Sequence, residues 1–150
     1  MEARKATVEQ PAFLYRIDGR SVVLVHGDRP PDNEGFLAFL SELEAIAKTR
    51  GSVRVLVYAA GDGGPNATQR AALRKLAPLP MRSALVTDSP AMRAVVTAVS
   101  WVMKQPLRAF PTKEAPTALD FLEVGTAEKL SICRMLAELC AEGHFSPLKF

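Results

Sequence analysis

The sequence has few of the residues on which most catalytic and metal sites depend. Among its 150 residues are two cysteines and two histidines, and no His, Cys or carboxylate spacing matches a zinc or calcium site. His26 ends a predicted strand, and no acidic, serine or cysteine motif surrounds His144. Nucleophilic catalysis by Ser or Cys requires a positioned base, most often histidine. We therefore expect a protein that is not an enzyme and has no metal site and no cofactor.

The two cysteines are not spaced for a disulfide within one helix. Cys133 and Cys140 lie in the same predicted helix, where seven residues place the Cα atoms about 10.5 Å apart. A disulfide requires Cα atoms within about 7 Å. They are interpreted as two small apolar residues in a reducing compartment.

The sequence also lacks a long apolar run and a cluster of like charges. The longest uncharged apolar stretch, 94–103, is about half of the roughly 20 residues that span a bilayer, and the polar first five residues do not resemble a signal peptide. The 19 basic and 16 acidic residues are scattered and leave a net charge of +3, whereas nucleic-acid binding requires clustered phosphate contacts. We expect a cytoplasmic protein without a membrane span and without a nucleic-acid partner.

The remaining composition is typical of one globular domain, with 48% hydrophobic and 23% charged residues. Two β-rich runs flank an Asp-Gly turn at Asp18, which predicts a hairpin. Helical patterns then alternate with buried strands. The predicted strands are 13–17, 21–26, 53–60, 83–87 and 107–110, and the predicted helices begin near residues 33, 67, 90, 112 or 116, and 127. The helix that begins at 112 or 116 is expected to reach residue 124. This order predicts an α/β domain with a mixed, mostly parallel sheet of about five strands.

Local signals mark several helix ends. Asp32 or Asn33 is placed to cap the first helix, and Gly51 ends it. Asn66 and Gln69 have capping-box spacing, and Ser89 followed by proline predicts the start of the third helix. The predicted organisation is a flexible tail over 1–12, a domain over 13–125, and an extra C-terminal helix with a short tail over 126–150.

A glycine-rich loop lies where open α/β sheets bind ligands, between the end of a buried strand and the start of a helix. It comprises Gly61, Asp62, Gly63 and Gly64, and the next strand ends in Asp88 and Ser89. The spacing matches neither a phosphate loop nor a dinucleotide-binding motif. Three interpretations remain for the loop: a turn that reverses the chain, a protein-contact surface, or a pocket for a small anion.

The single tryptophan lies on the outward face of the third predicted helix. Met92, Val95 and Val99 share one face of that helix, and Trp101 points nearly opposite, beside small residues. Such a tryptophan is either covered by another part of the chain or anchors a second copy or a partner. The C-terminal helix, apolar over more than half its circumference, is the candidate for intramolecular cover.

Four motifs carry a resemblance to a known family. They are Gly-Gly-Pro-Asn-Ala-x-Gln-Arg at 63–70, Val-Thr-Asp-Ser at 86–89, Val-Thr-Ala-x-Ser-Trp at 96–101 and Leu-Arg-Ala-Phe-Pro at 107–111. Together with the order of elements, they resemble the STAS domain of anti-sigma-factor antagonists, and in particular small bacterial STAS-like proteins. The resemblance covers residues 13–124.

The resemblance implies a non-catalytic module that binds a regulatory protein partner in bacterial signalling. Family members carry a switch Ser or Thr at the start of the helix after the third strand. This chain has no Ser there, and Thr68 is the only nearby hydroxyl and hence the possible phosphosite. The candidate surface comprises Gly61, Asp62, Gly63, Gly64, Asn66, Thr68, Asp88 and Ser89. The Trp101 face or the C-terminal helix could form a homodimer. The alternative function is a sensor of a nucleotide, anion or lipid, held between loop 61–66 and turn 88–89.

Overall fold

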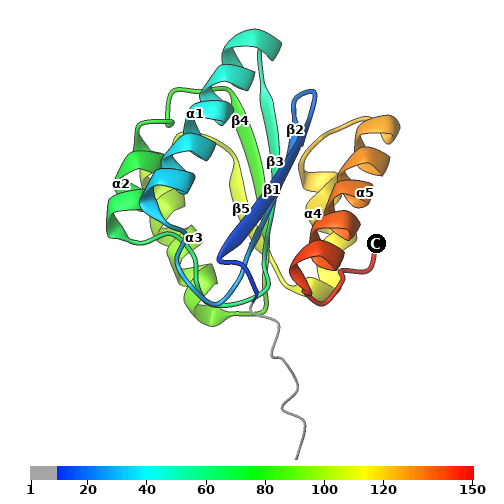
Figure 1. Cartoon of the computed structure of the whole chain (residues 1–150). Helices are drawn as coiled ribbons and strands as arrows, with labels where there is room; N and C mark the ends of the chain where they lie inside the picture. The colour runs from blue at the N-terminus through cyan, green and yellow to red at the C-terminus, as the bar shows by residue number, and fades with distance from the viewer. Residues whose placement is uncertain (1–9) are drawn as a thin grey trace, which may run out of the picture.

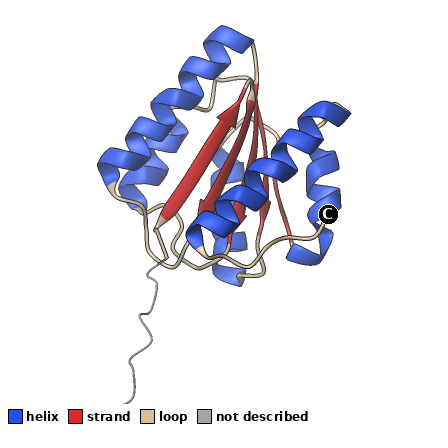
Figure 2. Cartoon of the chain, turned by 45° about the vertical axis from the view of Figure 1, so that its right-hand side comes forward, coloured by secondary structure: helices blue, strands red, loops and turns tan. Residues whose placement is uncertain are grey.

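The computed structural model describes residues 10–150, which form a five-stranded sheet between two layers of helices (Figures 1 and 2). The strands are β1 (Phe13–Asp18), β2 (Ser21–His26), β3 (Val53–Ala59), β4 (Met81–Val86) and β5 (Leu107–Phe110). They lie side by side in chain order. β1 pairs antiparallel with β2, and all other pairs are parallel. The predicted α/β fold with a mixed, mostly parallel sheet is confirmed. Of the predicted tail over 1–12, residues 1–9 lie outside the described part.

Five helices and one 3₁₀ turn complete the described chain. They are α1 (Asn33–Arg50), α2 (Ala67–Arg74), α3 (Pro90–Val102), the 3₁₀ turn η1 (Thr112–Glu114), α4 (Ala115–Phe121) and α5 (Thr126–Gly143). Because β2 to β5 are added in one direction across the sheet, right-handed crossovers place the connecting helices α1, α2 and α3 on one face. The opposite face is left to α4 and α5 (Figure 1).

Alternate side chains of each strand pack into two different cores, one on each face of the sheet. Val22 and Leu24 of β2 pack into the cluster beneath α1, whereas Val23 and Val25 pack into the cluster beneath α4 and α5. Successive residues of a strand point to opposite faces, so a strand covered on both sides must be apolar throughout. This accounts for the nearly continuous apolar runs in the sequence.

The predicted helix ends agree with the structure. The Asp32 side chain caps α1 by accepting a hydrogen bond from Gly35 N at 2.7 Å, and Gly51 ends this helix in the left-handed conformation, with φ of 80°. The capping box between Asn66 and Gln69 is present. Ser89 caps α3 with a proline in its first turn.

Two predicted boundaries are wrong. The fourth strand begins at Met81, because this residue continues the parallel register opposite Val53. The helix expected to reach residue 124 is divided into η1 and α4 and ends at Phe121. Glu123 follows with a positive φ of 53°, a conformation that an α-helix of L-residues does not continue.

α5 packs against β1 and β2. Its residues Ile132, Leu136 and Leu139 are buried in one core cluster with strand residues. Ion pairs add to this contact at the surface: Arg16 Nη1 lies 2.7 Å from Glu138 Oε2, and Arg20 Nε lies 2.7 Å from Glu128 Oε2. Ion pairs that remain in contact with solvent contribute about 0–1 kcal/mol each, so the apolar burial accounts for most of the docking energy.

The two cysteines lie on α5 and are not paired with each other. Cys133 is half-buried and Cys140 is buried. Burial raises the pKa of Cys140 to about 11, so its thiol is protonated at neutral pH. No helix in the described range 10–150 combines the length and the apolar character that crossing a bilayer requires.

Trp101 is exposed over 84% of its surface. Of the two interpretations of this side chain, cover by α5 is excluded, because α3 and α5 lie on opposite faces of the sheet (Figure 1). The pattern on α3 identified the outward side chain correctly, since Met92 and Val96 on the other side of the helix are buried. It contained no information about which face of the sheet α5 would occupy.

We expect the fluorescence of Trp101, the only tryptophan, to report this exposure. At low protein concentration the native emission maximum should match that of water-exposed indole, and unfolding in urea should change it little. A blue-shifted native maximum that moves to the red on unfolding would contradict the exposed position. A blue shift that develops only as protein concentration rises would favour a homodimer through this face.

Candidate functional site

The ends of the four parallel strands surround a hollow of about 310 Å³ at the lower edge of the sheet in Figure 1. This is the edge at which open α/β sheets bind ligands. The residues that line the hollow are Asp28, Tyr58, Ala59, Ala60, Gly61, Asp62, Thr87, Asp88, Ser89 and Thr112. They come from the residues at or just after the ends of β2, β3, β4 and β5.

The structure brings together half of the predicted site. Gly61, Asp62, Asp88 and Ser89 line the hollow, whereas the other four candidates do not. Those four are Gly63, Gly64, Asn66 and Thr68, which lead into α2 or lie in its first turn. Sequence reasoning missed the lining residues Asp28, Thr87 and Thr112. The sequence did contain a signal for Asp28, because this residue lies just after β2, as Asp62 lies after β3 and Asp88 after β4.

Asp88 connects the end of β4 to the segment after β5. Its Oδ1 accepts a hydrogen bond from Thr112 N at 2.9 Å, and its Oδ2 accepts one from Thr112 Oγ1 at 2.6 Å. These bonds, led by the one from the Thr112 side chain, lower the pKa of the Asp88 carboxyl. The carboxylate is therefore charged at neutral pH and fixed in place.

Thr87 positions the turn at the end of β4. Its side chain is fully buried, and its Oγ1 donates to Ala59 O at 3.2 Å and accepts from Ser89 N at 3.0 Å. Ser89 Oγ in turn accepts from Met92 N at 3.2 Å as the cap of α3. The Ser89 hydroxyl therefore serves the helix start, and nothing near it in this network is a base that would activate it as a nucleophile.

The glycines of the loop are explained by contact with the chain itself. A Cβ on Gly61 would lie 2.2 Å from Asp28 Oδ1, and a Cβ on Gly63 would lie 2.2 Å from Arg29 N. Gly63 N also donates to Gly27 O at 3.0 Å. Because the segment after β2 already occupies this space, these two glycines permit packing of two loops and do not cradle an anion.

The start of α2 is held against the start of α1 by a buried amide. Gln69 is 0% exposed, and its Nε2 donates to Pro31 O at 2.6 Å and to Asn33 Oδ1 at 3.0 Å. Asn66 Nδ2 donates to the same Asn33 oxygen at 3.3 Å. Asn66 is thus a structural residue. Thr68, at the second position of α2, is exposed to solvent at this edge.

The hollow is acidic. Its lining contains the carboxylates of Asp28, Asp62 and Asp88 and no lysine or arginine. All three aspartates are exposed, so the charges are hydrated, but together they disfavour a bound phosphate and favour cationic groups. Within residues 10–150, no group of three His, Cys, Asp or Glu side chains is placed to hold a metal ion. The arrangement offers hydrogen-bond acceptors to a partner.

The sequential mixed sheet, with its capped helix after β3, places the chain in the class of STAS-like α/β domains. A family model described as SpoIIAA-like matches residues 25–123, more than half of the chain, and the chain belongs to this family. The match includes every residue that lines the acidic hollow, whereas β1 and α5 lie outside it. No curated protein and no solved structure matches the chain.

Proposed function

We propose that the chain is a non-catalytic STAS-type regulatory module that binds a protein partner. The proposed binding surface, called here the carboxyl-edge surface, comprises the acidic hollow together with Thr68 on the first turn of α2. Membership of the SpoIIAA-like family supports a regulatory role. The observation that carries the proposal is the gathering of Asp28, Asp62 and Asp88, from three neighbouring strand ends, around one exposed hollow.

The charge of this surface defines the chemistry of the partner. Exposed carboxylates attract Lys and Arg side chains and accelerate association at low salt. Because the Debye length is about 8 Å at physiological ionic strength, we expect binding to weaken as salt rises. The partner surface should therefore be basic.

Thr68 is the proposed phosphorylation site, since the resemblance to STAS domains implies a switch hydroxyl at this helix start. A phosphate at the second helical position interacts favourably with the unpaired N–H groups of the first turn. It would also add negative charge to the carboxyl-edge surface. Thr68→Glu and Thr68→Ala should then differ in their affinity for the partner, and equal affinities would remove the switch.

The proposed surface is tested first by site-directed crosslinking in the host cell. A photo-crosslinking residue at Thr68 should capture a protein, whereas the same residue at exposed Lys104, close to the opposite edge of the sheet, should not. With the captured partner purified, Asp62→Arg should weaken binding about tenfold or more. Glu44→Arg, which makes the same charge change on α1, should have little effect. Equal effects of the two substitutions would refute the carboxyl-edge surface.

The alternative is a sensor of a nucleotide, anion or lipid at the same edge. The three carboxylates oppose the anionic ligands among these. A melting-temperature screen separates the two functions, because a ligand at about 100 times its dissociation constant stabilises the native state by about 2.7 kcal/mol. Stabilisation by nucleotides, phosphate or lipids, with an affinity that Asp62→Arg changes, would favour the sensor. Turnover of a substrate by the purified protein would refute both functions.

A further inference from the structure

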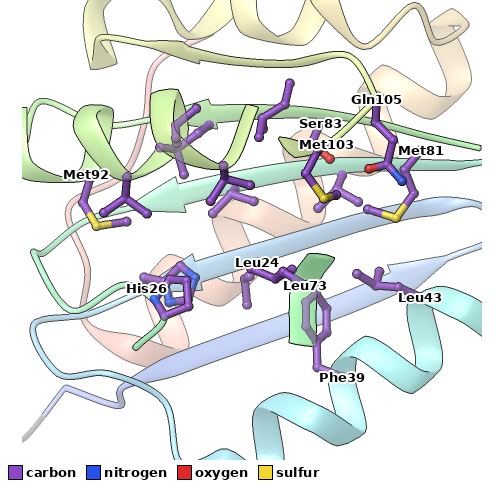
Figure 3. A pocket seen from close by; sticks show the side chains of 18 of the residues that line it. Leu24, His26, Phe39, Leu43, Leu73, Met81, Ser83, Met92, Met103 and Gln105 are labelled. Atoms are coloured by element: carbon purple, nitrogen blue, oxygen red, sulfur yellow. The ribbon is translucent and has the colours of Figure 1, made fainter. Parts of the chain in front are cut away.

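A second cavity, of about 120 Å³, lies on the face of the sheet that α1, α2 and α3 cover, between the strands and α3 (Figure 3). Its floor is made by alternate residues of β2, β3 and β4, and its roof by the apolar face of α3. No Asp, Glu, Lys or Arg lines it. It is therefore distinct in position and in chemistry from the acidic hollow.

The shortness of α2 accounts for the empty space. α1 and α3 flank α2 on the same face of the sheet (Figure 1), but α2 has 8 residues, and Gln69 is the buried residue within it. Leu73 reaches the cavity wall and is half-buried. Protein interiors seldom contain voids larger than a water molecule, so a cavity of this size indicates space for a ligand.

His26 supplies one polar group at one end of this cavity, close to Met92 (Figure 3). Its side chain is 3% exposed, and its Nδ1 has no hydrogen-bond partner among the described residues. Buried polar atoms are nearly always hydrogen-bonded, so an unpaired one on a residue that lines a cavity indicates a missing partner. Burial lowers the pKa of His26 to about 4, so the ring is neutral at pH 7 and offers one donor and one acceptor.

Three methionines, Met81, Met92 and Met103, also line the cavity. Methionine side chains adapt their shape to a ligand, and their sulfur atoms make favourable contacts with aromatic rings. An apolar cavity of about 150 Å³ in another protein holds benzene, and the cavity here is close to that size. The lining thus selects an uncharged molecule of about one aromatic ring.

We propose that this cavity binds a small neutral aromatic molecule whose single polar group forms a hydrogen bond with Nδ1 of His26. Phenol represents this ligand class. Toluene has the same shape but replaces the hydroxyl with a methyl group. The proposal is independent of the carboxyl-edge surface, because the cavity and that surface are lined by different residues.

The location of binding is tested by NMR of the full chain with ¹³C-labelled methionine methyl groups. Titration with phenol should shift the signals of Met81, Met92 and Met103 in a saturable manner. Met135, which is buried in the core on the opposite face of the sheet, should not shift and serves as the internal control. If neither phenol nor toluene shifts the three cavity signals, or if Met135 shifts equally, the proposal is refuted.

The role of His26 is tested by comparing the affinities for the two molecules. In His26→Leu, the ratio of phenol affinity to toluene affinity should fall about tenfold or more, because a buried hydroxyl without a partner is unfavourable. Should this variant fail to fold, the ¹⁵N signals of the wild-type imidazoles supply the answer. Phenol should shift Nδ1 of His26 and leave exposed His144 unchanged, and no shift of His26 would refute the hydrogen bond.

A variant that fills the cavity completes the test. Val99 is half-buried on the inner face of α3 and lines the cavity. Val99→Phe should abolish binding of both phenol and toluene while the Met135 signal stays in its native position. Unchanged affinity for both molecules in this variant would place them elsewhere and overturn the assignment.

Discussion

Leu136→Ala is expected to lower the free energy of unfolding by about 2–5 kcal/mol, whereas Leu130→Ala on the same helix should change it by less than about 0.5 kcal/mol. Leu136 is 2% exposed and lies in the core cluster beneath α5, and Leu130 is 68% exposed. Truncating the buried side chain removes its contacts and leaves a cavity, and truncating the exposed one does neither. Urea denaturation of the two variants measures the difference.

The matched pair determines whether α5 is an integral part of the folded unit. This helix begins after the end of the SpoIIAA-like match at residue 123, yet it covers one face of the sheet (Figure 2). If α5 is fully docked, the protein unfolds in urea in a single transition. The urea concentration at the midpoint of this transition is then lower for Leu136→Ala than for the wild type. Equal stabilities for the two variants would show that α5 is not packed against the sheet in solution.

Local signals accounted for most of the secondary structure. The Asp-Gly turn at Asp18, the cap at Asp32 and the capping box at Asn66 each depend on residues within a few positions of one another. Such features are stabilised by short-range hydrogen bonds and backbone preferences, and a single sequence displays them directly. The predicted boundaries of β4 were wrong, because they are determined by the register of its pairing with β3.

Those local signals did not predict the position of α5. An apolar helical face shows that a helix is buried, but not which surface buries it. Chain order and crossover handedness narrow the choice, since three crossovers in one direction place α1, α2 and α3 on one face. The opposite face of the sheet is then left uncovered, and α5 packs there, away from Trp101 on α3.

The candidate site was also predicted only in part. Asp62 and Asp88 were predicted because each directly follows a buried strand. Thr112 was missed, because its hydrogen bonds to Asp88 span 24 positions of sequence. Gly63 was assigned to the candidate surface as part of the glycine-rich loop, but it is buried against the chain's own loop at Arg29. The residues that follow the strands therefore indicated which edge of the sheet carries the candidate site. Only the three-dimensional structure distinguished the residues exposed at this edge from those that pack inside the protein.

His26 should make the protein less stable as the pH falls from 7 towards 4. Burial lowers the pKa of its side chain from 6.5 to about 4. Between these values the unfolded chain binds a proton at His26 and the native chain does not, so protonation favours unfolding. The stability present above pH 6.5 is progressively lost as the pH falls, and the loss is complete below about pH 4. One pKa unit corresponds to about 1.4 kcal/mol, which gives a total loss of about 3 kcal/mol.

Urea denaturation at pH 7, 5.5 and 4.5 measures this dependence, and two variants isolate its source. Other groups titrate in the same range, because the lowered pKa values of Asp88 and Glu128 also reduce stability in acid. His26→Phe, which fills a similar volume without a titrating proton, should lose most of the dependence between pH 6.5 and 4.5 and keep the carboxylate contribution. Leu130→Ala, a substitution at an exposed position without a titrating group, should retain the full wild-type dependence. A pH profile of His26→Phe parallel to that of the wild type would mean that the buried imidazole gains its proton without unfolding, and hence that a water or an anion reaches Nδ1 in the native protein.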